Sequence, residues 1–168
     1  MLIKLPAIWI ISLNVAGWLA IQFGLAWGFT RMPADWFLPG PASTWEDVGR
    51  FYERCFAIKW WKDFLPDGAQ WFSGGFAKST LITRDLGYLE RFIRETWRGE
   101  LCHWTALACA PAFIFWNPLW GDLVIIAYAI AANIPCILVQ RYNRLRLAKL
   151  QARGARASHA TGKASARS

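Results

Sequence analysis

The chain has 168 residues, 55% of them apolar, with 12 Trp and a formal net charge of +8. So many Trp in an apolar chain exclude an ordinary soluble domain and are typical of proteins that meet membrane interfaces. The charge is unevenly placed, because residues 31–100 hold ten basic and ten acidic side chains whereas residues 141–168 hold eight basic and no acidic ones. A cationic segment next to an apolar one indicates contact with anionic lipid headgroups. We therefore expect membrane lipids as partners and no nucleic acid.

The first predicted element is an uncharged stretch at residues 5–30. A helix needs about 20 mainly apolar residues to span a bilayer, so this stretch is long enough. Its apolar part is also longer than that of a secretory signal peptide. We predict an uncleaved transmembrane anchor here.

Two further stretches without Lys, Arg, Asp or Glu follow at residues 101–121 and 123–140. Both can span a bilayer, although the second is close to the minimum length. The connection between them, Asn117–Asp122, contains one Pro and one Gly, which favour a turn. Such a short connection predicts that the two spans form a tight antiparallel helical hairpin.

The basic side chains directly after residue 140 place the C-terminus in the cytoplasm. Residues 31–100 are then cytoplasmic too, and their aromatic rings interleaved with Lys and Arg are typical of helices in the headgroup layer. Residues 151–168, rich in Ala, Ser, Gly and Arg, predict a disordered basic tail. We thus predict an all-α integral membrane protein, multi-pass in the cell membrane. About three transmembrane helices and an interfacial cytoplasmic helical segment would form a single domain over residues 1–150.

Glu100 and His103 are the first candidates for chemistry, one helical turn apart at the start of the second predicted span. At this spacing a carboxylate can orient an imidazole for general-base catalysis, and ionisable groups at membrane depth are functional candidates. The structural alternative is an interfacial His103 satisfied by Glu100, and spacing alone favours neither. No metal is expected, because a Glu-x-x-His di-iron site needs a second such motif and the four Cys lack metal-ligand spacing.

The short turn predicts further polar neighbours for this Glu-His pair. It brings the end of the third span level with the start of the second, so Gln140, Arg141 and Asn143 should lie close to the pair. Asn133 lies about two turns deeper, where an unpaired amide is costly in free energy. It either bonds across the hairpin or points at a ligand.

An arginine stripe runs along roughly the opposite side of the second helix. Its members are Arg91, Arg94 and Arg98, which lie within reach of Glu90 and Glu95. The stripe can contact phosphates or headgroups, but a solvated face with its own ion pairs is the more common arrangement.

Polar residues at a fixed spacing continue through this half of the chain and carry a family resemblance. The patterns are Glu95-Thr96-x-Arg98-x-Glu100-Leu101-x-His103-Trp104, Tyr128-Ala129-x3-Asn133-x-Pro135 and Gln140-Arg141-Tyr142-Asn143-Arg144-x-Arg146-Leu147, with weaker similarity at Arg31-Met32-Pro33 and Lys59-x2-Lys62-x2-Leu65-Pro66-Asp67-Gly68. The sequence resembles the glycosyl-4,4'-diaponeurosporenoate acyltransferases over most of residues 1–150. That family performs the closing step of staphyloxanthin-type carotenoid synthesis.

The resemblance implies transfer of a fatty acyl group to a sugar hydroxyl of a glycosylated carotenoid or related glycolipid. Acyl-CoA or a similar thioester would be the donor substrate, and no cofactor is expected. On this reading we assign His103 as the catalytic base, oriented by Glu100. The expected substrate-binding residues are Arg98, Glu95, Asn133, Gln140, Arg141 and Asn143. The alternative function is a non-catalytic membrane scaffold that organises other pigment or lipid biosynthesis enzymes.

Overall fold

The computed structural model describes residues 3–37, 46–65 and 86–165, and this part of the chain contains helices and no strands. The α-helices are α1 (Ala7–Arg31), α2 (Glu46–Cys55), α3 (Ile58–Trp61), α4 (Leu86–Cys109) and α5 (Leu119–Ser165). Short 3-10 helices are η1 (Ala34–Trp36), η2 (Lys62–Phe64) and η4 (Ala110–Phe115). The predicted all-α class is therefore confirmed for the described residues.

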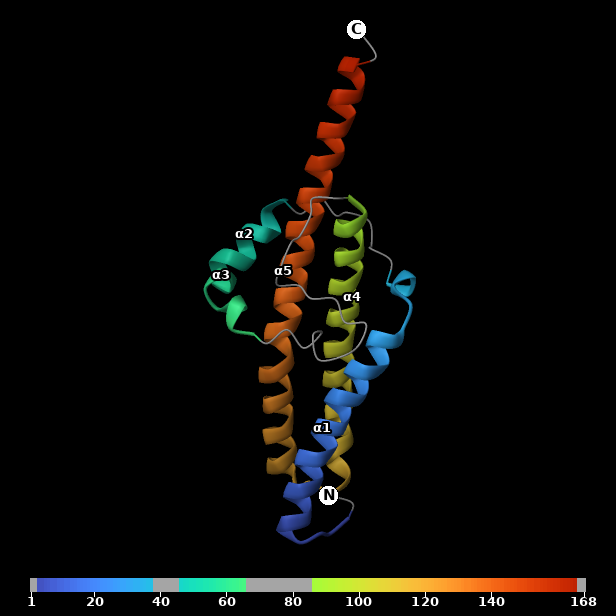
Figure 1. Cartoon of the computed structure of the whole chain (residues 1–168). Coiled ribbons are helices and arrows are strands. Elements are labelled where there is room, and N and C mark those ends of the chain that lie inside the picture. Colours follow the sequence, from blue (N-terminus) through green and yellow to red (C-terminus); the bar gives the residue numbers. More distant parts are fainter. Residues whose placement is uncertain (1–2, 38–45, 66–85, 166–168) are drawn as a thin grey trace.

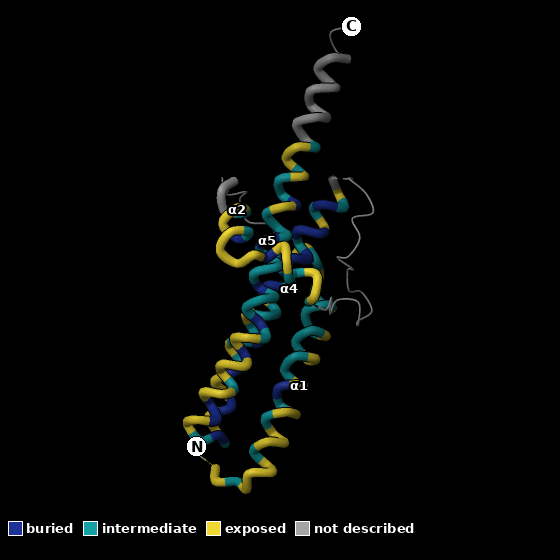
Figure 2. Tube along the Cα trace, turned by 90° about the vertical axis from the view of Figure 1, so that its left-hand side faces the viewer, coloured by how far each residue is buried: buried dark blue, intermediate teal, exposed yellow. Residues whose placement is uncertain are grey.

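Two of these helices are long and apolar enough to cross a membrane. They are α1 and the part of α5 as far as Gly154, whose most apolar 18-residue stretches have mean hydropathies of 1.6 and 2.1. Little of either apolar stretch is buried inside the protein, and Figure 2 shows exposed residues along α1 and along the first half of α5. Apolar helices that leave their side chains uncovered indicate membrane association.

Helices α4 and α5 pack against each other in opposite directions, and α1 lies beside them (Figure 1). Near the start of α4, Leu89 packs against Leu147 of α5. Near its end, the chain continues into η4, where Phe113 packs with Ala129 of α5 and Trp18 of α1. The apolar ends of α1, α4 and α5 are thus gathered at one end of the molecule.

The helix boundaries differ from those of the predicted spans. The helix that enters the stretch at residues 101–121 already begins at Leu86, and its α-helical part ends at Cys109. Pro111 lacks the N–H that an α-helix needs, so the chain tightens into η4 at this point. After the turn, α5 begins at Leu119 and runs without a break past Pro135 to Ser165, through much of the predicted tail.

Helices α2 and α3 lie against the middle of α5 (Figure 1). The contact is built from Tyr52, Ile58 and Tyr142, which are all buried. Between the two short helices, Ala57 adopts a left-handed backbone with φ of 46°, which is unfavourable for a residue with a Cβ. The Trp61 indole donates a 2.7 Å hydrogen bond to the Phe56 carbonyl and braces this reversal.

An amide pair joins α1 to the connection between η4 and α5. Asn14 and Asn117 exchange two side-chain hydrogen bonds of 2.9 and 3.0 Å. The Trp116 indole donates a third to the Asn14 carbonyl oxygen at 2.8 Å. Because Asn117 is fully buried, these bonds satisfy polar groups that would otherwise be costly there.

Candidate active site

His103 on α4 contacts Asn133 on α5. Its Nδ1 lies 2.9 Å from the Asn133 Oδ1, and Asn133 is fully buried between the helices. Asn133 also donates from Nδ2 to the Ala129 carbonyl at 2.9 Å. The amide of Asn133 therefore bonds across the helix pair, which was one of the two roles that the sequence left open.

These two bonds determine where the proton on the His103 ring lies. The Ala129 carbonyl can only accept, so the Asn133 amide must turn its NH₂ toward Ala129 and its oxygen toward His103. That oxygen can also only accept, so the His103 Nδ1 must carry the hydrogen. In the neutral ring the Nε2 atom then keeps its lone pair, which is the form that a general base requires.

The Glu100 carboxylate bonds to α5 through two arginines. Arg141 Nε lies 2.5 Å from one carboxylate oxygen and Arg144 Nη2 lies 2.6 Å from the other. The Trp104 indole donates to Glu100 as well, at 3.2 Å. Only 2% of the Glu100 side chain is exposed, against 17% for Arg144 and 42% for Arg141. The structure thus pairs His103 with Asn133 and Glu100 with the two arginines, and the orientation of His103 by Glu100 stays a prediction.

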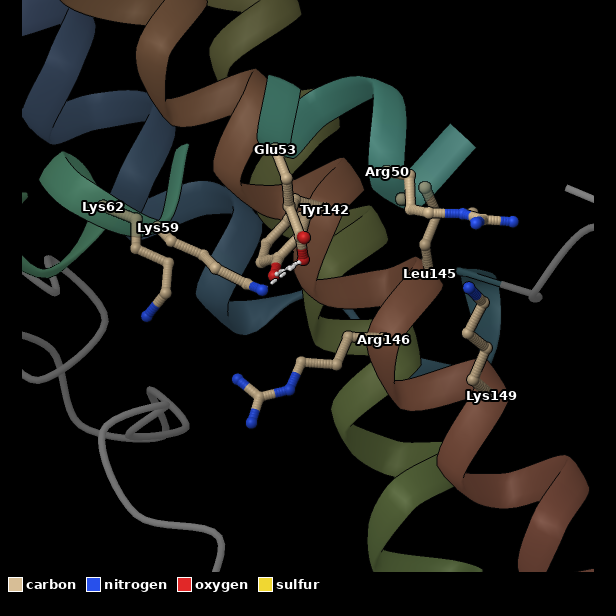
Figure 3. Close-up of a pocket in the computed structure, with 9 residues that line it drawn as sticks. Arg50, Glu53, Lys59, Lys62, Tyr142, Leu145, Arg146 and Lys149 are labelled. Carbon is tan, nitrogen blue, oxygen red and sulfur yellow. Dashed lines mark hydrogen bonds and ion pairs between the residues drawn. The ribbon is translucent and has the colours of Figure 1, made fainter. Parts of the chain in front are cut away.

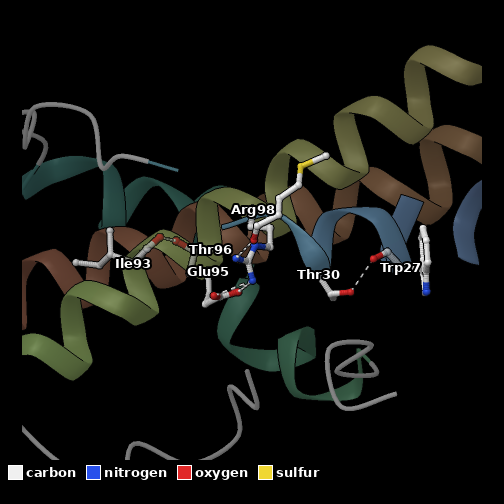
Figure 4. Close-up of polar contacts among 7 residues, drawn as sticks. Trp27, Thr30, Ile93, Glu95, Thr96 and Arg98 are labelled. Carbon is white, nitrogen blue, oxygen red and sulfur yellow. Dashed lines mark hydrogen bonds and ion pairs between the residues drawn. The ribbon is translucent and has the colours of Figure 1, made fainter. Parts of the chain in front are cut away.

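Glu95 and Arg98 form a buried ion pair of their own (Figure 4). Arg98 Nη1 donates to both Glu95 oxygens at 2.8 and 2.9 Å, and its Nη2 donates to the Met32 carbonyl at 2.8 Å. The guanidinium also lies over the Phe37 ring, 5.2 Å from its centroid. These contacts attach the segment after α1 to α4, so the pair is engaged within the protein.

The remaining predicted residues lie on α5 around the Glu100 cluster. Gln140 is two turns beyond Asn133 on the same face of the helix, directly before Arg141, and it is half-buried. Asn143, directly before Arg144, is half-buried as well. The predicted placement of Arg141 next to Glu100 is confirmed by their contact.

Two groups of polar residues were not singled out from the sequence. Arg144 pairs with Glu100 and stacks on Trp97 at 3.8 Å from the ring centroid, and its Nη1 is buried without a hydrogen-bond partner among the described residues. Tyr142 donates to Glu53 of α2 at 2.8 Å. Arg144 stood in the quoted pattern and its spacing from Arg141 was a usable signal. No signal in the sequence pointed to the contact between Tyr142 and Glu53, because 89 residues separate them.

These observations define a helical, membrane-associated protein with a polar site between α4 and α5. The family model of the glycosyl-4,4'-diaponeurosporenoate acyltransferases matches residues 33–153. Proteins named glycosyl-4,4'-diaponeurosporenoate acyltransferase from Staphylococcus aureus strains USA300 and NCTC 8325 / PS 47 are each 35% identical over 138 residues, covering 79% of this chain and 82% of each relative. The protein of the same name from strain MRSA252 is 34% identical over the same length. No solved structure matches the chain.

The chain belongs to the glycosyl-4,4'-diaponeurosporenoate acyltransferase family. This confirms the predicted resemblance and makes the protein an acyltransferase. The matched range includes His103, Asn133 and the Glu100 cluster, so the site lies inside the part of the chain that defines the family.

Proposed function

We propose that the protein is a membrane enzyme that transfers a fatty acyl group from a thioester donor, such as acyl-CoA, to a sugar hydroxyl of a glycosylated carotenoid or related glycolipid. The observation that carries this proposal is the hydrogen bond between His103 Nδ1 and Asn133, which orients a half-buried imidazole and makes Nε2 the acceptor nitrogen of its neutral form. The names of the S. aureus relatives supply the class of acceptor.

In the proposed reaction His103 Nε2 accepts the proton of the acceptor hydroxyl while its oxygen attacks the thioester carbonyl. A carbon–oxygen bond forms and the carbon–sulfur bond breaks. The departing thiolate then takes the proton from the imidazolium, so the enzyme returns to its starting state. General-base catalysis of this kind contributes roughly 10²- to 10⁴-fold to a rate.

The arginines held by Glu100 would stabilise the negative charge that develops on the carbonyl oxygen. Arg141 keeps 42% of its side chain exposed, and Arg144 Nη1 is buried without a hydrogen-bond partner in the described part of the chain. A buried donor of this kind is satisfied when a ligand oxygen reaches it. Glu100 would act as a positioning residue for both arginines, with Gln140 and Asn143 as further contacts for the substrates.

We further propose three membrane spans with the C-terminus in the cytoplasm. Helix α1, the apolar end of α4 with η4, and the first half of α5 lie at the same end of the molecule, which supports this topology (Figure 1). The eight basic side chains after residue 140 support the orientation. A lipid-soluble acceptor would then enter sideways from the bilayer, while a donor would approach from the cytoplasm.

The test is His103→Gln in the full-length protein, purified in detergent and supplied with acyl-CoA and a glycosylated carotenoid. We expect the yield of ester, measured by mass spectrometry, to fall by roughly 10²- to 10⁴-fold. The matched control is His159→Gln, which changes the second His of the chain and should leave the rate unchanged. Full activity of a folded His103→Gln protein would contradict the proposed mechanism. Absence of any ester with the wild-type protein would contradict the proposed substrates.

A further inference from the structure

A cationic cleft lies between α2, α3, η2 and α5, with a volume of about 380 Å³. Of the residues that line it, one is acidic, Glu53, and five are basic: Arg50, Lys59, Lys62, Arg146 and Lys149. Figure 3 shows several of these side chains reaching into the space around the Tyr142–Glu53 hydrogen bond. Such an excess of positive charge in a concave surface attracts anions.

The single carboxylate of the cleft is already engaged by its neighbours. Glu53 binds Lys59 at 2.9 Å and accepts the Tyr142 hydroxyl at 2.8 Å. The hydrogen bonds from Lys59 and Tyr142 hold the pKa of the Glu53 carboxyl below its usual value of 4.5. Glu53 therefore stays charged at neutral pH and fixes α2 to α5, which keeps the walls of the cleft in place.

The cleft lies where a membrane surface is expected. The apolar stretch of α5 ends at Gln140, and the residues that α5 contributes to the cleft begin directly after it, at Tyr142. On the opposite wall, Trp60 and Phe64 flank the cleft lysines and are 81% and 80% exposed. Exposed aromatic rings beside Lys side chains are typical of segments that lie in the headgroup layer.

The cleft lies on the other side of α5 from the His103–Asn133 pair. Asn133 and Tyr142 are about two and a half helical turns apart, so they lie on opposite sides of α5. A phosphate in the cleft would therefore be separated from His103 by the helix itself. The acyl donor carries its phosphates and its thioester in one molecule. To use this cleft, it would have to place the phosphates on one side of α5 and the thioester at His103 on the other. The position therefore favours a different ligand.

We propose that this cleft binds the phosphate headgroup of an anionic membrane lipid. The cationic side chains pair with the phosphate, the Tyr142–Glu53–Lys59 cluster forms the floor, and Trp60 and Phe64 lie among the neighbouring lipids. A basic pocket at the cytoplasmic end of an apolar helix is a common binding site for anionic lipid headgroups. This lipid site is independent of the proposed acyl transfer, because its ligand is bound and not consumed.

The test measures lipid binding by native mass spectrometry of the full-length protein in a neutral detergent. Phosphatidylglycerol and phosphatidylcholine are titrated separately against the wild type and against Arg146→Gln/Lys149→Gln. Each cation near a membrane surface contributes about one kcal/mol to anionic-lipid binding, so the double variant should bind phosphatidylglycerol roughly 10- to 30-fold more weakly. The matched control, Arg31→Gln/Arg153→Gln, removes two exposed cations that do not line the cleft, and because only Arg31 ends an apolar helix, it should weaken binding by about fivefold at most.

A second variant is expected to bind phosphatidylglycerol more tightly than the wild type, a result that misfolding would not produce. Glu53→Gln removes the negative charge of the cleft while its side-chain oxygen can still accept from Tyr142, so phosphatidylglycerol should bind about threefold to fivefold more tightly. Equal weakening by the cleft and control variants, or equal affinity for both lipids, would overturn the proposal. Displacement of phosphatidylglycerol by coenzyme A, one molecule for one, would also overturn it and assign the cleft to a soluble phosphate ligand.

Discussion

At the scale of single residues, one buried amide decides the chemistry available to His103. Asn133 can offer its oxygen to the ring only because its NH₂ is held by the Ala129 carbonyl within the same helix. A carboxylate at this position would attract a second proton to the imidazole and favour its charged form. A neutral amide orients the ring without adding a charge beside it, and as an acceptor it selects the neutral tautomer with the hydrogen on Nδ1.

The residue-scale prediction concerns Asn133→Leu, which keeps the volume of the side chain and removes its hydrogen bonds. We expect kcat to fall about tenfold or more, because the ring is no longer held in one tautomer, while KM for the acyl donor stays the same. The control is Asn14→Leu, which also deletes a hydrogen-bonded amide of an apolar helix, but at the far end of the molecule. It should lower thermal stability and leave kcat per folded molecule unchanged. A similar kcat for the Asn133→Leu and Asn14→Leu variants would contradict the proposed role of Asn133 in positioning His103.

At the scale of helices, the Glu100 cluster links α4 to α5 through two ion pairs. One buried carboxylate meets two guanidiniums, and one of these stacks on Trp97 while the other lies 5.9 Å from the centroid of the Trp104 ring. Removing the carboxylate would leave two cations beside each other with no counter-charge of their own. The cluster therefore sets the register of the helix pair as well as the position of the arginines.

The element-scale prediction is that Glu100→Gln destabilises the protein by roughly 2–4 kcal/mol. The expected loss lies at the lower end of the range for a broken buried ion pair, because Arg141 is 42% exposed. Thermal unfolding in detergent, followed by circular dichroism, measures the effect. Glu90→Gln is the matched control, since it breaks the more exposed pair with Arg94 and should lose less than about one kcal/mol. Equal melting temperatures for both variants would contradict the role of Glu100 as a link between helices.

The sequence was sufficient for some parts of the site and insufficient for others. The short connection before Leu119 fixes which residues of α4 and α5 are level, so Arg141 could be placed beside Glu100 in advance. The choice of partner could not be predicted, because Glu100 had both His103 and the arginines within reach. The guanidiniums of Arg141 and Arg144 are charged donors, and charged donors bind a buried carboxylate more strongly than uncharged ones do. His103 contacts Asn133.

At the scale of the whole molecule, charge and hydropathy divide the protein into two parts. The end that contains Trp18, Phe113 and Ala129 exposes apolar side chains, whereas the end that contains the cleft exposes cations. The all-α class followed from hydropathy alone. The packing of α2 against α5 did not, because it depends on contacts between buried residues that are distant in the sequence, such as Tyr52 and Tyr142.

The whole-molecule prediction tests the proposed topology by cysteine labelling in intact cells. In a background in which the four native Cys are replaced by Ser, Trp120→Cys should react with a membrane-impermeant maleimide added from outside, because this position is 70% exposed in the turn region before the apolar part of α5. Arg153→Cys, also at an exposed position, should react only after the membrane is made permeable. The reverse pattern would invert the orientation, and labelling of both positions from outside would contradict a spanning α5.

The amide pair at the apolar end has a consequence for how the protein is made. The partners of Asn14 lie 102 and 103 residues further along the chain, so the ribosome has yet to synthesise them when α1 emerges. In the proposed topology α1 therefore enters the bilayer while the side chain of Asn14 is unsatisfied. This unpaired amide makes α1 less stable in the bilayer until the later segments pack against it. Hydrogen bonding of Asn117 and Trp116 to Asn14 satisfies this amide, so these contacts can hold α1 in place only after residues 116–117 have been made.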